Sequence, residues 1–248
     1  MPRPTTFKEF AWLCTVVYEP TISATFGFAR FNDTVRRASG FQGAIFRRSN
    51  GSGLDWVVAV TGTQPDREMG VDVVADAGFG GPKGMAIGLA ATVVVPLLGP
   101  VLTTLSATGQ GLLTHQCQCA EELVKHARRA MDRKDRVYIT GHSLGGGIAQ
   151  IISARTGVAA VAISSPAVTA VPGVSASWQR THSPIVCLRV RNDPINQTGM
   201  LGQWLGRVVL LNSPRTGGDA HSILQTAQEL SPQGQFTTLG EQDPFGNP

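Results

Sequence analysis

The sequence predicts an α/β protein with a mostly parallel central sheet flanked by helices. Three observations support this class. Apolar, β-branched runs alternate with helical runs from residue 136 onward, which is typical of a parallel sheet whose strands are joined by helices. The chain has 248 residues, 42% of them hydrophobic, so one domain spanning residues 1–248 can bury a sizeable core. A glycine-flanked turn also joins one strand to the helix that follows it.

The first element expected is a short amphipathic helix in the N-terminal segment MPRPTTFKEFAWLCTVVYEP. The apolar part of this segment includes Lys8 and Glu9 and has no clear small-residue cleavage site. This is not the layout of a cleavable signal peptide. We therefore expect a cytoplasmic protein, or one exported by a route that needs no cleavable signal.

Two β-type runs come next, at residues 41–48 (FQGAIFRR) and 54–61 (LDWVVAVT). The sequence SNGSG between them contains Asn-Gly and Ser-Gly, which favour tight turns, so the two runs are expected to form a hairpin. The second run is mostly apolar, which favours a central strand buried on both faces.

Residues 84–114, GMAIGLAATVVVPLLGPVLTTLSATGQGLLT, contain no charged residue. A membrane-spanning helix needs about 20 apolar residues, but Pro96, Gly99 and Pro100 interrupt this run. We expect an apolar, lid-like insertion made of a pair of short helices, or a membrane-docking segment. A buried helical hairpin is the structural alternative.

The remaining elements follow from apolar periodicity and turn residues. Helices are expected at residues 116–134, 144–155 and 221–230, and strands at residues 136–140, 158–163, 184–190 and 208–211. The last residues, 231–248, are rich in Gln, Gly and Pro and are expected to form a flexible tail.

The stretch VYITGHSLGGGIAQI contains the pentapeptide Gly-His-Ser-Leu-Gly between a predicted strand and a predicted helix. This strand–turn–helix context is what a G-x-S-x-G nucleophile elbow requires. Gly141 and Gly145 remove side chains that would collide with the adjacent strand and helix. We therefore expect Ser143 to be a catalytic nucleophile, with the Leu144 amide placed to bind an oxyanion.

A serine nucleophile needs a base and an acid, which follow it in the order Ser, acid, His in α/β-hydrolases. His221 fits that order best. Asp193 and Asp219 are the acidic residues between Ser143 and His221, and Asp193 directly follows the strand IVCLRVRN, so we favour it as the acid. The other histidines lie within the elbow, in a helical run, at a helix start or at a loop end, and are set aside: His115, His126, His142 and His182.

These segments resemble those of the class 3 lipases, also called fungal-type triacylglycerol lipases, of the α/β-hydrolase fold. The similar segments are VVAVTGTQ, VDVVADAGF, YITGHSLGGGIA, AISSPAV, LRVRNDPIN and GDAHSI, in this order over roughly residues 41–230. The resemblance implies Ser143 as nucleophile, Asp193 as acid and His221 as base. It also implies Thr63 and Leu144 as the oxyanion hole, and a movable lid at the place of the uncharged segment.

The function predicted is that of a serine hydrolase cleaving carboxylic esters of lipids, either triacylglycerol or phospholipid, at a membrane or lipid aggregate, without metal or cofactor. Small-ester hydrolysis and acyl transfer use the same residues and remain alternatives. A third alternative is a membrane-binding or membrane-inserting protein, including a bacterial effector delivered to another cell.

Two other classes of function are disfavoured. The net charge is only +4, and the basic residues accompany no nucleic-acid motif, so nucleic acid is not an expected partner. A zinc site built from cysteines is the second class, because the four cysteines show no C-x-x-C spacing. They are expected to be buried or partly buried free thiols.

Overall fold

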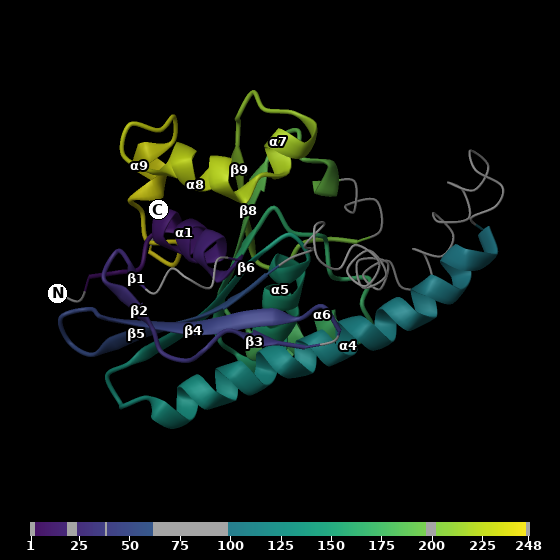
Figure 1. The fold of residues 1–248 in the computed structure, drawn as a ribbon, viewed down its shortest axis with the longest axis horizontal. Helices are drawn as coiled ribbons and strands as arrows, with labels where there is room; N and C mark the ends of the chain where they lie inside the picture. The colour runs from purple at the N-terminus through teal and green to yellow at the C-terminus, as the bar shows by residue number, and fades with distance from the viewer. Residues whose placement is uncertain (1–2, 19–23, 38, 62–98, 197–201, 247–248) are drawn as a thin grey trace.

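The apolar, β-branched runs of the chain pair into one sheet, and helices cover both of its faces (Figure 1). The structure is a computed structural model that describes residues 3–18, 24–37, 39–61, 99–196 and 202–246. Its strands are β1 (Ala24–Thr25), β2 (Phe28–Arg30), β3 (Val35–Arg36), β4 (Gln42–Ser49), β5 (Leu54–Val60), β6 (Arg136–His142), β7 (Ala159–Ile163), β8 (Ile185–Val190) and β9 (Arg207–Leu211). Its helices are α1 (Phe7–Tyr18), α4 (Gly99–Ala130), α5 (Leu144–Thr156), α6 (Val174–Thr181), α7 (Gly217–His221), α8 (Ile223–Leu230) and α9 (Thr237–Gly240).

The predicted mostly parallel sheet is confirmed. The strand order is β1-β2-β4-β5-β6-β7-β8-β9, and β3 also pairs with β4. Strands β5 to β9 run parallel to one another, and His142 at the end of β6 pairs with Ile163 at the end of β7. Because parallel strands end at the same edge, the segments that follow β6, β8 and β9 meet there. This is the edge at which open α/β sheets bind ligands.

The predicted hairpin is also confirmed. Strands β4 and β5 pair antiparallel along their length. The side-chain oxygen of Asn50 accepts hydrogen bonds from the N–H groups of Ser52 and Gly53, both at 3.0 Å. These bonds close the turn locally, as Asn side chains do. Strand β5 is buried along nearly its whole length, as expected for a central strand.

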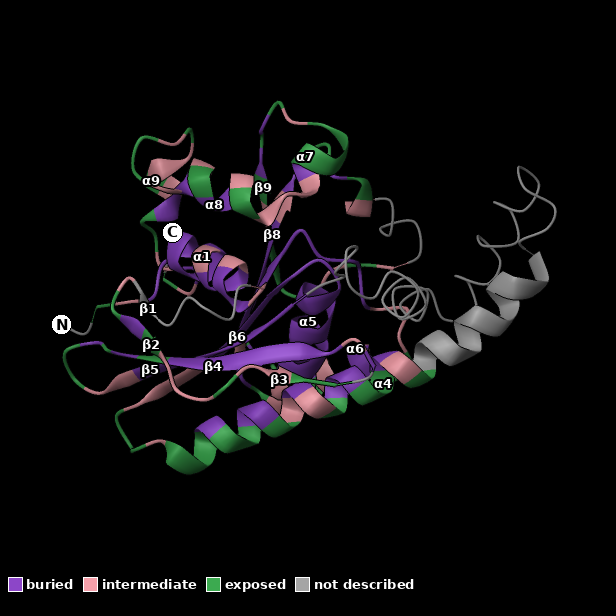
Figure 2. Ribbon diagram, viewed as in Figure 1, coloured by how far each residue is buried: buried purple, intermediate pink, exposed green. Residues whose placement is uncertain are grey.

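Side chains of the sheet alternate between two separate cores. Val57 and Val161 point to the face covered by α1 and α8, whereas Val58 and Ile139 point to the face covered by α4, α5 and α6. Figure 2 shows the central strands as buried between the two helical layers. The central strands, and therefore their ends, are held from both faces.

Helix α1 is buried almost all round instead of being amphipathic. Even Lys8 and Glu9 are buried. Glu9 Oε1 lies 2.6 Å from Arg48 Nη1 and 2.6 Å from Arg3 Nη2, and Lys8 pairs with Glu241. A buried charge is tolerated only with such partners. The charges that made the segment look half-solvated therefore belong to ion pairs, and both side chains of the Glu9–Arg48 pair are buried.

Helix α4 is longer than the sequence predicts. It begins at Gly99 rather than at residue 116, and it ends at Ala130 rather than at residue 134. Pro100 is compatible with this start because proline is tolerated in the first turn of a helix. Residues 99–114 are thus continuous with the rest of α4, and the expected pair of short helices does not occur in them. Residues 84–98 lie outside the described residues.

A search of the described helices for one with the length and hydropathy of a membrane span finds none.

Residues 231–246 do not form the expected flexible tail. They include α9, and the Gln242 carbonyl accepts a hydrogen bond from the Phe7 N–H at 3.1 Å. The ring of Phe245 stacks on Tyr138 at 5.6 Å and meets the edge of Phe10 at 6.2 Å. The prediction is wrong because the aromatic anchor formed by Phe245 docks on the α1 face of the sheet and orders a segment whose Gly and Gln content favours flexibility.

Candidate active site

Ser143 lies at a sharp turn between β6 and α5. Its backbone dihedrals are φ 58° and ψ −130°, a combination that residues with a Cβ rarely adopt. The Ser143 N–H donates to the Ile163 carbonyl at 3.1 Å, and the Ser143 carbonyl accepts from the Gly146 N–H at 2.9 Å. The strained residue is therefore held from both the neighbouring strand and the following helix.

The two glycines around Ser143 are required by close approach of the backbone. A Cβ atom on Gly141 would lie 2.3 Å from the carbonyl carbon and oxygen of Gly145. A Cβ atom on Gly145 would lie 2.4 Å from the carbonyl oxygen of Thr61 and 2.5 Å from that of Val60. The predicted collisions with the adjacent helix and strand are confirmed, and they explain why the elbow needs glycine at both positions.

Asp193 lies just beyond the end of β8, at the same edge of the sheet. Its N–H donates to the Val190 carbonyl at 3.2 Å. Its Oδ1 accepts from the Ile195 N–H at 3.0 Å. The carboxylate is fully buried, so a short turn fixes its direction and water does not screen it.

His221 brings the two residues together. Its Nδ1 lies 2.9 Å from Asp193 Oδ1 and 3.0 Å from Oδ2, and its Nε2 lies 2.8 Å from Ser143 Oγ. A carboxylate only accepts hydrogen bonds, so Nδ1 carries the proton and Nε2 of the neutral ring accepts from the Ser143 hydroxyl. The three residues predicted from the sequence thus form one hydrogen-bonded chain.

The helix that was expected to begin at His221 begins two residues later. His221 instead ends α7, and the next residue, Ser222, caps α8 by accepting a hydrogen bond from the Gln225 N–H at 3.3 Å. Serine is a strong N-cap residue, which explains the break between the two short helices.

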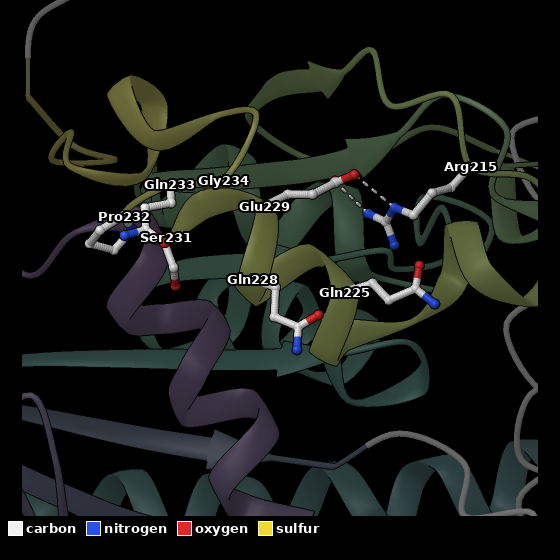
Figure 3. A pocket seen from close by; sticks show the side chains of 8 residues that line it. All are labelled: Arg215, Gln225, Gln228, Glu229, Ser231, Pro232, Gln233 and Gly234. Atoms are coloured by element: carbon white, nitrogen blue, oxygen red, sulfur yellow. Dashed lines mark hydrogen bonds and ion pairs between the residues drawn. The ribbon is translucent and has the colours of Figure 1, made fainter.

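Arg215 ties the segment that carries His221 to α8 (Figure 3). Its Nη2 lies 2.7 Å from Glu229 Oε2, and its Nε lies 3.1 Å from Glu229 Oε1. The same guanidinium donates to the Asp219 carbonyl and to Thr226 Oγ1. A planar, two-pronged pair of this kind fixes direction as well as distance.

An open depression lined mainly by polar residues lies along α8 and includes this ion pair (Figure 3). Its lining residues are Arg215, Gln225, Gln228, Glu229, Ser231, Pro232, Gln233 and Gly234. It shares no residue with the Ser143–His221–Asp193 chain, so we do not assign it to a substrate of that chain.

His142 is a contact of the site that sequence reasoning missed. Its ring is buried, and the centroids of the His142 and His221 rings lie 4.7 Å apart with an angle of 43° between the ring planes. Its Nε2 lies 2.7 Å from the backbone carbonyl oxygen of His221. Burial, followed by the nearby His221, lowers the pKa of His142 to about 3. The pairing of His142 with His221 joins residues far apart in the sequence, so no local sequence pattern points to it.

The alternative acid and the other histidines do not join this chain. Asp219 is exposed, and its Oδ1 accepts from the Gln225 side-chain amide at 3.0 Å. Helix α4 and the C-cap of α6 hold the remaining histidines, His115, His126 and His182.

Leu144 is the first residue of α5 and directly follows Ser143. The first N–H groups of a helix have no partner within the helix, and they lie at its positive end. A free amide donor is therefore available next to the Ser143 hydroxyl. Thr63, the other predicted oxyanion residue, lies outside the described residues.

The cysteines are free thiols, as predicted. Burial raises the pKa of Cys14, Cys117 and Cys187 to about 12. Because the thiolate is the reactive form of cysteine, these side chains stay protonated and unreactive at neutral pH.

Comparison with known proteins gives a family match. The model of the class 3 lipase family matches residues 48–171, which is half of the chain and includes the elbow. A search of curated proteins gives no significant match.

Similar solved structures include three fungal lipases. A triacylglycerol lipase from Penicillium expansum shares 12% identity at a TM-score of 0.46, with 87% of this chain and 80% of that chain covered. Lipase II from Rhizopus niveus shares 13% identity at a TM-score of 0.45, with 93% of this chain and 89% of that chain covered. The Rhizomucor miehei lipase propeptide complex shares 13% identity at a TM-score of 0.45, with 83% of this chain and 67% of that chain covered.

The family model spans β5, β6, β7 and the elbow that holds Ser143, whereas Asp193 and His221 lie beyond residue 171. Membership in this family supports a carboxylic ester hydrolase with a lipid substrate. The chain therefore belongs to the class 3 lipase family and has an α/β-hydrolase fold.

Proposed function

We propose that the protein is a serine-dependent lipase that hydrolyses carboxylic ester bonds of lipids through an acyl-enzyme. The observation that carries the proposal is the unbroken chain from Ser143 through His221 to Asp193, with contacts of 2.8 Å and 2.9 Å. A hydroxyl, an imidazole and a carboxylate in this arrangement activate serine in several unrelated folds. Membership in a lipase family supports the same chemistry.

In this mechanism His221 Nε2 takes the proton of Ser143 as Oγ attacks the ester carbonyl carbon. Asp193 accepts a hydrogen bond from Nδ1 and stabilises the imidazolium. The imidazolium then gives its proton to the departing alcohol oxygen, and the acyl group stays on Ser143. Water, deprotonated by His221, attacks the acyl carbon. The fatty acid leaves, and the serine hydroxyl is restored.

The oxyanion of each tetrahedral intermediate needs hydrogen-bond donors. We propose the Leu144 amide as one donor, because it follows Ser143 directly and lies at the positive end of α5. We propose Thr63 as the second donor. Removing one such donor typically lowers kcat by about 10²–10³.

The proposed substrate is a triacylglycerol or phospholipid at the surface of a membrane or lipid aggregate. Support comes from residues 84–114, which contain no charged side chain and precede the elbow in the chain. As a lid, this segment would expose apolar surface only where lipid covers it. Much higher activity is then expected on dispersed lipid than on a soluble short-chain ester.

A fluorophosphonate probe tests the proposal together with Ser143→Ala. The probe should label Ser143 in the wild-type protein, and Ser143→Ala should lose both labelling and turnover. Ser164→Ala is a matched control, because Ser164 also has a positive φ, of 45°, and is buried after the neighbouring strand β7. It should keep both properties. Turnover by Ser143→Ala would contradict the proposal.

The reaction products separate the remaining alternatives. Fatty acid released from triacylglycerol or from phospholipid vesicles identifies the lipid class. Equal activity on soluble short-chain ester would contradict the lid and favour a small-ester esterase. Transfer of the acyl group to an added alcohol would favour an acyltransferase. Vesicle leakage caused by Ser143→Ala would favour a membrane-inserting protein.

A further inference from the structure

His142 occupies a buried position between the elbow and the segment that carries His221. It is the last residue of β6, and its side chain is 6% exposed. Thr140, two residues earlier and therefore on the same face of the strand, contacts Cys14 of α1 at 3.4 Å. His142 thus points to the face that α1 covers, where Tyr18 ends that helix.

The hydrogen-bond partners of His142 set its tautomer. Nε2 lies 2.7 Å from the carbonyl oxygen of His221, and because a carbonyl only accepts, Nε2 carries the proton. Nδ1 lies 3.5 Å from the Tyr18 hydroxyl, which can donate to it over this longer distance. His142 is therefore a neutral ring that donates on one side and accepts on the other.

The carbonyl bound by His142 belongs to a segment with few buried side chains, which Arg215 also contacts at the Asp219 carbonyl. Within α7, Ala220 is the buried residue, whereas Gly217, Gly218 and Asp219 are exposed. Segments with few apolar contacts open easily unless polar contacts hold them. The hydrogen bond from His142 to the His221 carbonyl restrains the backbone position from which the His221 ring projects.

We propose that His142 is a positioning residue that holds the backbone of His221, so that Nε2 of His221 stays within hydrogen-bond distance of Ser143 Oγ. The inference rests on the proposed function, in which His221 is the base. It adds a role for the residue before the nucleophile, acting through the backbone of the base and not through the substrate.

Neutrality of His142 is part of this role. The groups that face its ring are Tyr18, His221 and, through a weaker charge interaction, Asp193. A positive charge on His142, with its ring 4.7 Å from that of His221, would oppose the imidazolium that His221 forms in the reaction. Burial lowers the pKa of His142 to about 3, which keeps the ring uncharged at neutral pH.

Two variants separate positioning from packing. His142→Leu introduces an apolar side chain of similar volume and removes the hydrogen-bond donor. His142→Gln keeps an amide N–H that can reach the same carbonyl. We expect His142→Leu to lower kcat by roughly 10- to 100-fold with KM little changed, because misplacement of a catalytic group has losses of about this size. His142→Gln should recover most of this loss. The rate of fluorophosphonate labelling at Ser143 should follow kcat, whereas Tm should not separate the two variants.

Wild-type kcat in His142→Leu, or equal losses in the two variants, would overturn the inference. If His142→Leu does not fold, the wild-type protein still provides a test. Its ¹⁵N spectrum should show His142 protonated at Nε2 alone and not titrating between about pH 5 and 8. Titration in that range would overturn the inference. Turnover by Ser143→Ala would contradict the proposed function. An inactive Ser143→Ala together with wild-type activity of His142→Leu would contradict only the positioning role of His142.

Discussion

Both carboxylate oxygens of Asp193 lie within hydrogen-bond distance of Nδ1 of His221, at 2.9 Å and 3.0 Å. The carboxylate is fully buried, whereas the His221 side chain is 30% exposed. The buried carboxyl group therefore holds the proton of the imidazole on the side away from Ser143. The acid sets the tautomer of the base, and this relationship can be tested by an isosteric change.

Asp193→Asn should keep the shape of the site but lower kcat by about 10³–10⁴, the size of loss seen when a serine hydrolase base is held in the wrong tautomer. The reason is that an amide NH₂ can donate to Nδ1 and leave Nε2 protonated toward Ser143. Steady-state kinetics on a dispersed lipid measure the effect. Asp219→Asn, two residues from His221 and exposed, is the control and should stay within about twofold of wild type. Equal losses in both variants would argue against Asp193 as the acid.

Ser143→Gly should produce an inactive protein that is more stable than Ser143→Ala by about 1 kcal/mol. The backbone at this residue has φ 58° and ψ −130°, which glycine adopts without strain and alanine does not. Thermal melting of the two variants gives the comparison. Both variants lack the catalytic hydroxyl and should be inactive, so the comparison reports stability alone. A lower Tm for Ser143→Gly would show that the turn stores no strain.

The same substitution should have opposite effects at two helical glycines. Gly145→Ala should destabilise the protein by several kcal/mol or prevent folding, because its Cβ would lie 2.4 Å from the Thr61 carbonyl oxygen. Gly111→Ala, in α4, meets no atom within 4 Å and should stabilise the protein by about 0.5–1 kcal/mol through helix propensity. Urea denaturation measures both. A tolerated Gly145→Ala would mean that the elbow is not tightly packed against β5.

The elbow could be predicted from the sequence because its causes are local. Strand, small residues and helix follow one another around Ser143, and each constrains the next through backbone geometry. Asp193 could be predicted because it comes directly after a strand, and parallel strands end at one edge of the sheet. His221 could be predicted from the order in which nucleophile, acid and base occur along the chain. The helix expected to begin at His221 begins instead at Ile223, because Ser222 is its cap.

Contacts between distant segments could not be predicted in this way. The bond from His142 to the His221 carbonyl joins residues 79 positions apart, and nothing in the neighbourhood of either residue encodes it. The burial of Glu9 depends on Arg48, and the docking of Phe245 depends on Tyr138. For Glu9 and Phe245, composition indicated solvent exposure, and a partner brought close only by the fold reversed that preference.

Stability should fall as the pH is lowered below about 6.5, in part because of His142. Its pKa is lowered from 6.5 to about 3 in the folded protein by burial. The unfolded chain therefore binds more protons between these values, which favours unfolding by up to about 1.4 kcal/mol per pH unit. Above the upper value the ring is neutral in both states, and its contribution is fully present.

Comparison of wild type with His142→Gln isolates this effect, since the other titrating groups are shared. Urea denaturation at several pH values should give a shallower dependence of the unfolding free energy on pH for His142→Gln. Parallel curves would show that His142 titrates alike in the folded and unfolded states.

The pair formed by Arg215 and Glu229 should contribute both to stability and to activity. Their side chains are 12% and 17% exposed, and Nη2 lies 2.7 Å from Oε2, so the pair is less screened than a surface ion pair. Arg215→Met should destabilise the protein by about 2 kcal/mol, because it removes the charged partner of the mostly buried Glu229 carboxylate. It should also lower kcat, because Arg215 holds the Asp219 carbonyl in the segment that carries His221.

A double-mutant cycle with Glu229→Gln tests this coupling. The two changes together should cost less than the sum of the single changes, by about 1 kcal/mol or more, as expected for residues in direct contact. Arg191→Met serves as the control, because Arg191 is an exposed arginine near the end of β8, and it should change stability by no more than about 0.5 kcal/mol. Additive single changes would mean that Arg215 acts through its carbonyl contacts instead, in which case kcat should still fall in Arg215→Met but not in Glu229→Gln.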